Sequence, residues 1–211
     1  MRKIITISRE FGSGGRELGK RLAEALGFAY YDREILTMLA EQTELDENYL
    51  EQTLERGTQS SLFPITIGQT FSVLPNYVAE QSTALLQKQT ALIKHLAAEK
   101  DCVIVGRNAD IILRDHDPLR LFVYADLAAR IDRCRRREKG DKPLTDKEYE
   151  KMIRQIDKAR ARTHGILGPY DWGDRRGYDL CVNTGPVVIA DIVPALAGYA
   201  RSWFESSEKL R

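Results

Sequence analysis

Residues 3–27 read KIITISREFGSGGRELGKRLAEALG. This stretch begins with an apolar run, continues with a glycine-rich segment and ends with leucines at helical spacing. The run at 3–8 is apolar and β-branched, which is typical of a buried strand. Three glycines follow within residues 12–15, and then leucines recur on one face of a predicted helix that Gly27 ends. A phosphate-binding loop requires this order of strand, turn and helix. Glycines let backbone N–H groups face an anion, and the helix start adds partial positive charge.

The glycine-rich turn departs from the common pattern G-x-x-x-x-G-K-[ST], because Arg16 replaces the lysine and Glu17 replaces the hydroxyl residue. Arginine keeps a fixed cation whose fork suits phosphate oxygens. Glu17 would repel a phosphate unless Mg²⁺ lies between the two or its side chain points away. The nearest candidate for an indirect metal contact is then Ser13. The predicted nucleotide-binding residues are Gly12, Ser13, Gly14, Gly15, Arg16 and Glu17.

Beyond this segment, short apolar runs alternate with amphipathic ones. Strands are predicted at 28–31, 102–105, 119–124 and 178–182, and helices at 34–42, 46–55, 76–99, 125–138, 145–162 and 188–204. Residues 57–75 contain Gly, Ser and two prolines and are typical of a loop or mobile insertion. Alternating strands and helices predict a parallel α/β sheet, whose ligands lie at the carboxyl ends of the strands.

Length and composition exclude several classes of protein. A chain of 211 residues is expected to form one domain, or one domain with inserted lobes. The charges nearly cancel to +1, which argues against a nucleic-acid-binding protein. No apolar run approaches the roughly 20 residues that span a bilayer. The three cysteines are distant from one another and are typical of reduced thiols. We therefore expect a cytoplasmic protein with no membrane partner.

Four stretches resemble the cytidylate kinase-like proteins, P-loop relatives of bacterial cytidylate kinase in the nucleoside monophosphate kinase group. They lie at 4–36, 103–113 (VIVGRNADIIL), 121–133 (LFVYADLAARIDR) and 170–185 (YDWGDRRGYDLCVNTG). The resemblance implies a P-loop NTPase-like parallel sheet of about five strands flanked by helices. It also implies a single domain over 1–211, with a helical acceptor-binding insertion at 33–99 and a lid region at 140–176.

The resemblance further implies roles for individual residues. The segment 12–16 would hold the donor triphosphate, and Asp32 and Arg33 would begin the acceptor-binding segment. Arg107, in the Gly-Arg pair that ends the third predicted strand, would reach the acceptor phosphate. Cytidylate kinase has an acidic residue after this pair, where this chain has Asn108. That departure bears on the acceptor base and on metal handling.

The positions of the arginines independently support a phosphotransferase. Phosphoryl transfer needs several cations that converge on the negative charge of the transferring group. Arg130, Arg133 and Arg137 recur at helical spacing on one face of the segment 125–138. Arg160 and Arg162 lie at the end of the next helix, with Asp157 able to orient Arg160. The predicted catalytic residues are Arg16, Arg130, Arg133, Arg160 and Arg162.

The sequence leaves open the roles of Arg9, of Asp110 and of the predicted helix at 76–99. Arg9 flanks the loop, where it would touch phosphate or pair with Glu10 or Glu17. Asp110 would bind a ligand or cap the next helix, and we favour the cap. The helix at 76–99 is long enough for a homodimer interface, although a core-facing helix explains it equally well.

Taken together, the sequence predicts a nucleoside monophosphate kinase-like phosphotransferase. It would move the γ-phosphoryl group of ATP, with Mg²⁺, to CMP or a related phosphorylated small molecule. The alternative is a nucleotide-binding regulatory protein with a degenerate loop and little or no catalysis. Glu17 and the missing lysine favour that alternative, whereas the two arginine clusters count against it.

Overall fold

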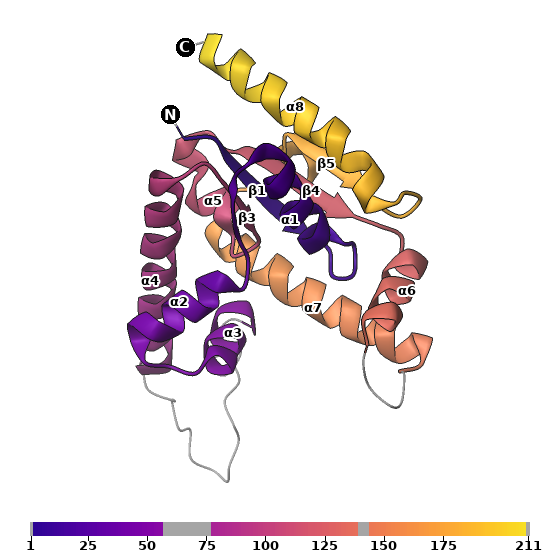
Figure 1. Ribbon diagram of the computed structural model, residues 1–211. Coiled ribbons are helices and arrows are strands. Elements are labelled where there is room, and N and C mark those ends of the chain that lie inside the picture. Colours follow the sequence, from indigo (N-terminus) through magenta and orange to yellow (C-terminus); the bar gives the residue numbers. More distant parts are fainter. Residues whose placement is uncertain (1, 57–76, 139–143, 210–211) are drawn as a thin grey trace.

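The computed structural model describes residues 2–56, 77–138 and 144–209 (Figure 1). Its centre is a parallel sheet in the order β2-β3-β1-β4-β5. The strands are β1 (Ile4–Arg9), β2 (Ala29–Tyr31), β3 (Cys102–Val105), β4 (Leu119–Tyr124) and β5 (Leu180–Asn183). This arrangement confirms the predicted fold class. Because β1 lies between β3 and β4, the loop that follows β1 sits where the chain order reverses, which is where such sheets bind ligands.

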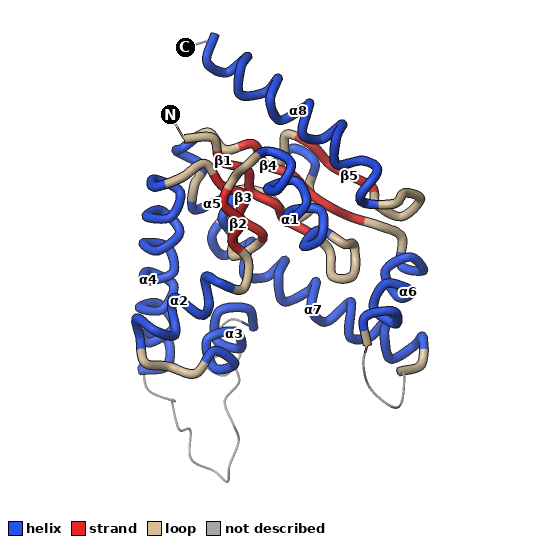
Figure 2. The backbone as a smooth tube through the Cα atoms, viewed as in Figure 1, coloured by secondary structure: helices blue, strands red, loops and turns tan. Residues whose placement is uncertain are grey.

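Helices cover both faces of the sheet (Figures 1 and 2). On one face α1 (Gly15–Leu26) packs beside α8 (Ile189–Lys209), and their apolar residues meet Ile5, Ile7 and Val123 of the strands. On the other face, Ile4 and Ile104 join a second core cluster with α2 (Glu34–Thr43), α3 (Glu47–Arg56), α4 (Tyr77–Glu99) and α5 (Ala109–Ile112). Burial on both faces explains why the strand β3 is a continuous apolar run.

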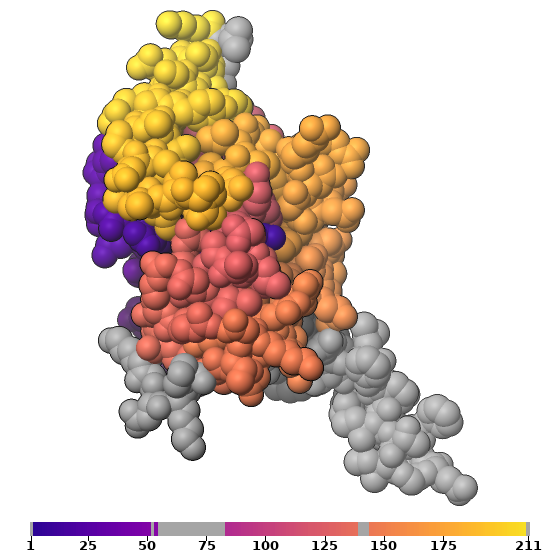
Figure 3. Space-filling view, turned by 90° about the vertical axis from the view of Figure 1, so that its right-hand side faces the viewer, coloured from indigo at the N-terminus to yellow at the C-terminus, as the bar shows by residue number. Residues whose placement is uncertain are grey.

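Two groups of helices extend beyond the carboxyl edge of the sheet (Figure 1). One consists of α2, α3 and the adjoining part of α4, which pack against one another. The other consists of α6 (Leu127–Arg137) and the first half of α7 (Asp146–Leu167). Because α7 packs against both α6 and α3, it connects the two groups across the end of the sheet. In the space-filling view of Figure 3, the segment around α6 (salmon) lies below α8 (yellow), and the segment around α7 (orange) lies along the right-hand side.

Local signals account for the ends of these helices. The predicted capping box is confirmed, since the Thr145 and Glu148 side chains each bond the other's backbone N–H at the start of α7. Asp126 caps α6 by accepting a hydrogen bond from the Ala129 N–H at 2.8 Å. Gly27, with φ of 70°, ends α1 as predicted.

The structure departs from the prediction mainly in helix length. The helix α7 continues to Leu167 rather than to 162, because Thr163 and His164 are buried and stabilise the extra turn. The helix α8 continues to Lys209 rather than to 204. The predicted loop or mobile insertion at 57–75 lies outside the described residues. No described helix is both long and apolar enough to cross a membrane.

Candidate active site

The loop between β1 and α1 is shaped by its glycines. Gly12 and Gly14 have φ of 79° and 85°, in the left-handed region that suits glycine. A Cβ atom on Gly14 would lie 2.3 Å from the Ile189 Cδ1 atom, and one on Gly12 would lie 2.9 Å from the Arg130 carbonyl oxygen. Because α1 begins at Gly15, its first N–H groups have no partner within the helix. The loop therefore presents backbone N–H groups at a helix start, as an anion-binding site requires.

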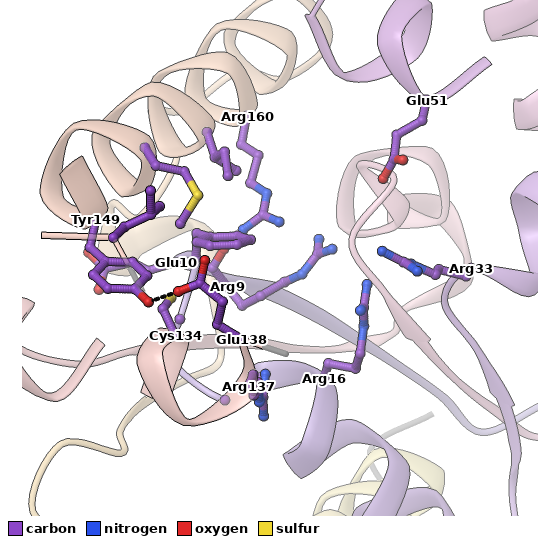
Figure 4. Close-up of a pocket in the computed structure, with 17 residues that line it drawn as sticks. Arg9, Glu10, Arg16, Arg33, Glu51, Cys134, Arg137, Glu138, Tyr149 and Arg160 are labelled. Atoms are coloured by element: carbon purple, nitrogen blue, oxygen red, sulfur yellow. Dashed lines mark hydrogen bonds between the residues drawn. The ribbon is translucent and has the colours of Figure 1, made fainter. Parts of the chain in front are cut away.

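A pocket of about 410 Å³ lies over this loop (Figure 4). Its walls come from the loop itself, from α6 and α7, and from the α2–α3 side. Five arginines line it, namely Arg9, Arg16, Arg33, Arg137 and Arg160. Three carboxylates also line it, namely Glu10, Glu51 and Glu138. A concave site of this size with an excess of cations suits a polyanionic ligand.

The two ends of the pocket differ in chemistry. In Figure 4, Arg9, Arg16, Arg33 and Arg160 gather at one end, whereas Tyr149 and Glu138 lie at the other. The Tyr149 hydroxyl donates a hydrogen bond to Glu138 there, and Leu144, Met152 and Ile156 add apolar lining. Sequence reasoning missed this apolar end, although the apolar spacing of 149, 152 and 156 on a predicted helix could have indicated it.

Asp32 pairs with two of the arginines that line the pocket. Its carboxylate forms an ion pair with the Arg16 guanidinium and lies 3.9 Å from Nη2 of Arg9. Asp32 is buried, whereas the Arg16 side chain is about half exposed toward the pocket. Arg9 thus has a partner that was not considered from the sequence, and it also lines the pocket. In this conformation Asp32 orients cations and does not itself line the pocket.

Glu17 does not line the pocket. Its carboxylate accepts a hydrogen bond from Nε of Arg21 at 3.1 Å and lies 3.5 Å from Nη2 of Arg137. Of the two alternatives considered for Glu17, the structure favours the outward orientation. The repulsion expected between Glu17 and a bound phosphate is thereby reduced, because the side chain is already paired with two cations.

Ser13 is completely buried, and its hydroxyl donates a hydrogen bond to the Glu10 carbonyl oxygen at 2.8 Å. In this conformation the hydroxyl does not face the pocket, which argues against the indirect metal contact predicted for it. The Ser13 carbonyl accepts hydrogen bonds from Thr184 Oγ1 and, at 3.2 Å, from Arg133. Ser13 therefore closes the loop and fixes it to the end of β5.

Arg133 and Arg130 support the loop from behind rather than line the pocket. The Arg133 guanidinium donates hydrogen bonds to the Ser13 and Thr184 carbonyl oxygens, and burial lowers its pKa. Arg130 is buried, donates to the Phe11 carbonyl at 2.7 Å, and pairs with Glu10 and Asp157. Their predicted catalytic contact with substrate is therefore not supported here. Each is a positioning residue.

Asp157 has the expected partner Arg160 and, at closer range, a second partner in Arg130. It pairs with Arg130 and accepts a hydrogen bond from the Phe11 N–H at 2.8 Å, whereas Nη1 of Arg160 lies 3.9 Å away. Arg160 donates a hydrogen bond to the Arg9 carbonyl at 3.1 Å and lies over the Phe11 ring. Arg160 lines the pocket as predicted, but Arg162 lies on the exposed side of α7 and does not.

Arg107 borders a second, smaller cavity at the end of β3. Gly106, Arg107 and Asn108 have φ of 75°, 58° and 53°, so three successive residues adopt the left-handed conformation. Non-glycine residues in this region cost about 1 kcal/mol or more each, and such strain concentrates at functional sites. The small cavity shares Arg9 and Arg160 with the main pocket, which brings Arg107 next to the arginine-rich end.

Asp110 neither binds at the pocket nor caps a helix through its side chain. Its carboxylate is buried and lies 2.9 Å from Nε2 of the buried His164, so the pair joins α5 to the last turn of α7. The preference for a cap is therefore wrong. The sequence could not show this contact, because the two residues are far apart in the chain.

Comparison with known proteins places these features in a family. The model of the cytidylate kinase-like family matches residues 4–186. The chain belongs to the cytidylate kinase-like family. It is also similar to a protein named cytidylate kinase from Haloarcula marismortui, with 28% identity over 183 residues that cover 86% of this chain and 80% of the relative.

Solved structures with this fold include two informative neighbours. An uncharacterized protein from Eubacterium ventriosum is 26% identical, with a TM-score of 0.69 over 95% of this chain and 99% of the other. A shikimate kinase from Acinetobacter baumannii in complex with shikimate is 14% identical, with a TM-score of 0.55 over 96% and 94%. The second likeness concerns the fold alone. Membership of the cytidylate kinase-like family supports a kinase-like phosphotransferase and leaves the acceptor to be established.

Proposed function

We propose that this cytidylate kinase-like chain transfers the γ-phosphoryl group of ATP to the phosphate of CMP or of a related phosphorylated small molecule. The observation that carries the proposal is the convergence of five arginines on one pocket whose wall is the glycine-rich loop. Phosphoryl transfer depends on positioning and on neutralising charge over the transferring group. Arginines from the loop, from the α2 side and from α6 and α7 would supply both.

The proposed division of the site follows from which element each cation belongs to. The loop at 12–16 would hold the donor triphosphate at the start of α1. Residues 33–99 would form the acceptor lobe, entered past Asp32 and Arg33, with Arg107 at its base. Residues 140–176 would act as the lid. Arg160 lines both cavities, so it would lie between the donor and acceptor phosphates.

The side chains fit a magnesium ion that arrives with the nucleotide better than a resident metal. The described residues contain no cluster of three or more His, Cys, Asp or Glu side chains that could hold a metal ion. Mg²⁺ is usually held by one or two carboxylates together with substrate phosphates and water. Glu10, Glu51 and Glu138 are the carboxylates that line the pocket and could take part. When bound, the ion would neutralise charge on the donor phosphates.

The chain's own part in the reaction would be binding and orientation. An oxygen of the acceptor phosphate would attack the γ-phosphorus, and the bond to the leaving ADP oxygen would break, without a covalent enzyme intermediate. No general base is required because the acceptor phosphate is already anionic. The donors that meet the developing charge would be the loop N–H groups, Arg16 and Arg160.

Two features of the loop support a second candidate function. The position of the usual hydroxyl is occupied by Glu17, and the Arg16 cation is paired with Asp32. A loop that binds nucleotide but orders the metal poorly would suit a regulatory protein with weak or no catalysis.

The cytoplasmic location and the homodimer that the sequence suggested remain predictions.

A turnover panel separates the two candidates. The protein is mixed with Mg-ATP and, one at a time, with CMP, dCMP, UMP, AMP and GMP, and nucleoside diphosphate formation is followed. The proposal expects rapid turnover of at least one acceptor, with cytidine nucleotides preferred. If ATP raises the melting temperature while no acceptor is turned over, the regulatory function is favoured instead.

Arg107→Ala tests the acceptor side of the site. Because a hydrogen bond to a charged group contributes about 1.5–3 kcal/mol, the KM for the acceptor is expected to rise by about 10-fold or more. The KM for ATP should change little, since the glycine-rich loop is untouched. Steady-state kinetics with each substrate varied in turn measures both. An effect on ATP alone would contradict the assignment of Arg107 to the acceptor.

A further inference from the structure

A small cavity lies beside the main pocket. The proposed function gives no role to Gln89, which is one of the residues that line this cavity. The cavity holds about 40 Å³ and lies among the ends of β1 and β3, the helix α4 and the second half of α7. Gly106, Arg107 and Asn108 form its β3 side, and Gln89 enters it from α4. Since Arg9 and Arg160 line both cavities, the small one lies next to the arginine-rich end of the main pocket.

The buried side chain of Gln89 is expected to lower the stability of the folded protein. Its side chain is 2% exposed, and its Oε1 atom has no hydrogen-bond partner in the part of the chain that the structure describes. A buried carbonyl without a partner costs about 1–3 kcal/mol, whereas an apolar side chain of the same shape would cost little. A buried polar atom without a partner requires an explanation, and at a cavity wall a donor group of a bound ligand would supply the missing hydrogen bond.

The chemistry of that ligand group follows from the Oε1 atom itself. A carbonyl oxygen accepts hydrogen bonds, so the group that meets it must donate one. A fully ionised phosphate has only acceptor oxygens and cannot satisfy it. The phosphate of an acceptor would instead face the neighbouring arginines. The group that meets Gln89 therefore belongs to the part of the acceptor that is not phosphate, and it carries an O–H or N–H.

We propose that Gln89 is a specificity-determining residue, which selects acceptors that place a hydroxyl or amino group in the small cavity while their phosphate lies among Arg9, Arg107 and Arg160. This inference rests on the proposed function and deepens it. The cavity is too small for a whole nucleobase, because it holds only one or a few water-sized groups. It would take the exocyclic amino group of a base or the 2′-hydroxyl of the sugar.

The test replaces Gln89 with methionine, which is similar in volume but cannot accept a comparable hydrogen bond. Gln87→Met is the matched control, because Gln87 lies two residues earlier on α4 and is exposed. Acceptor KM and kcat are measured for both variants and the wild type, with the melting temperature alongside. For Gln89→Met we expect kcat/KM of the preferred acceptor to fall about 10-fold, mainly through KM. The KM for ATP should be unchanged and the melting temperature equal or higher.

Three acceptors distinguish the two sources of the donor. UMP lacks the amino group of CMP, and dCMP lacks the 2′-hydroxyl. If the amino group meets Gln89, the wild type discriminates against UMP and Gln89→Met loses that discrimination. If the hydroxyl does, the same holds for dCMP. Equal loss for all three acceptors, or a lowered melting temperature with unchanged selectivity, would show a structural role and overturn the inference.

Failure of this inference can be told apart from failure of the proposed function. A wild type that turns over an acceptor, with a Gln89→Met variant of the same selectivity, overturns only the role of Gln89. If the wild type turns over none of the acceptors, calorimetric titration of CMP, UMP and dCMP without ATP still compares binding to the two proteins. Absence of binding by all three would overturn both proposals.

Discussion

Replacement of Arg130 by methionine is expected to lower the free energy of unfolding by about 3–5 kcal/mol. The Arg130 guanidinium lies between the carboxylates of Glu10 and Asp157, and all three side chains are largely shielded from water. Removing the cation leaves two like charges facing each other in a poorly solvated site. It also removes the donor to the Phe11 carbonyl at 2.7 Å. Urea denaturation of the wild type and the variant measures the difference.

This loss should depend on pH. Burial already raises the pKa of Glu10, while Arg130 acts to lower it, so removing Arg130 raises the pKa further. A carboxyl whose pKa is higher in the folded than in the unfolded protein favours folding at low pH and loses that contribution as pH rises. The variant is therefore expected to be closest to the wild type near pH 5 and furthest from it near pH 8.

Arg136→Met is the matched control for Arg130. It lies on the same helix, is exposed, and pairs with Asp132 on the surface. Such surface pairs contribute little, so the expected change is within about 0.5 kcal/mol. Equal small effects for Arg130→Met and Arg136→Met would contradict the structural role assigned to Arg130, and a loss for Arg130→Met that did not vary with pH would contradict its electrostatic cause.

Replacement of Arg160 by methionine is expected to lower kcat by about 100- to 1,000-fold, as removal of a preorganised charge donor does in other enzymes. Arg160 is the predicted lid arginine that lines both cavities, and its hydrogen bond to the Arg9 carbonyl holds it over the loop. Methionine keeps the apolar contact with the Phe11 ring and removes the charge. Single-turnover kinetics with saturating Mg-ATP and acceptor measures the step directly.

Lys158→Met is the control for Arg160, because Lys158 is a cation on the exposed side of the same helix α7 and lines neither cavity. Its kcat should stay within about twofold of the wild type, since surface substitutions away from such features have small effects. If Arg160→Met turned over acceptor as fast as Lys158→Met, Arg160 would have no part in the transfer.

The fold could be predicted from the sequence because its signals are local. The run at 3–8, the glycines at 12–15 and the capping box at 145–148 each specify their own conformation and agree with one another. The conformation of the glycine-rich loop could be predicted for the same reason. Its glycines are required by φ values and by close approach of Ile189, and both requirements leave a trace in the residue type.

The roles of the arginines could not be predicted in this way. Helical spacing places Arg130, Arg133 and Arg137 on one face, but only the tertiary structure shows that the first two face buried carbonyls and carboxylates. Arg137, which lies one turn after Arg133 on α6, instead lines the pocket and pairs with Glu17. The pairs Asp110 with His164 and Asp32 with Arg16 join distant segments, and no local pattern encodes them.

Calorimetric titration of ATP into the wild type and into Arg16→Ala tests most directly whether the bend at 12–15 receives polyanions. We expect the wild type to bind one ATP per chain, with affinity that falls as salt rises, because exposed charges are screened. Binding to Arg16→Ala should be about 10- to 100-fold weaker, the loss of a charge-assisted hydrogen bond. If neither ATP, ADP nor sulfate gave heat with the wild type, or if Arg16→Ala bound ATP equally well, the site would lie elsewhere.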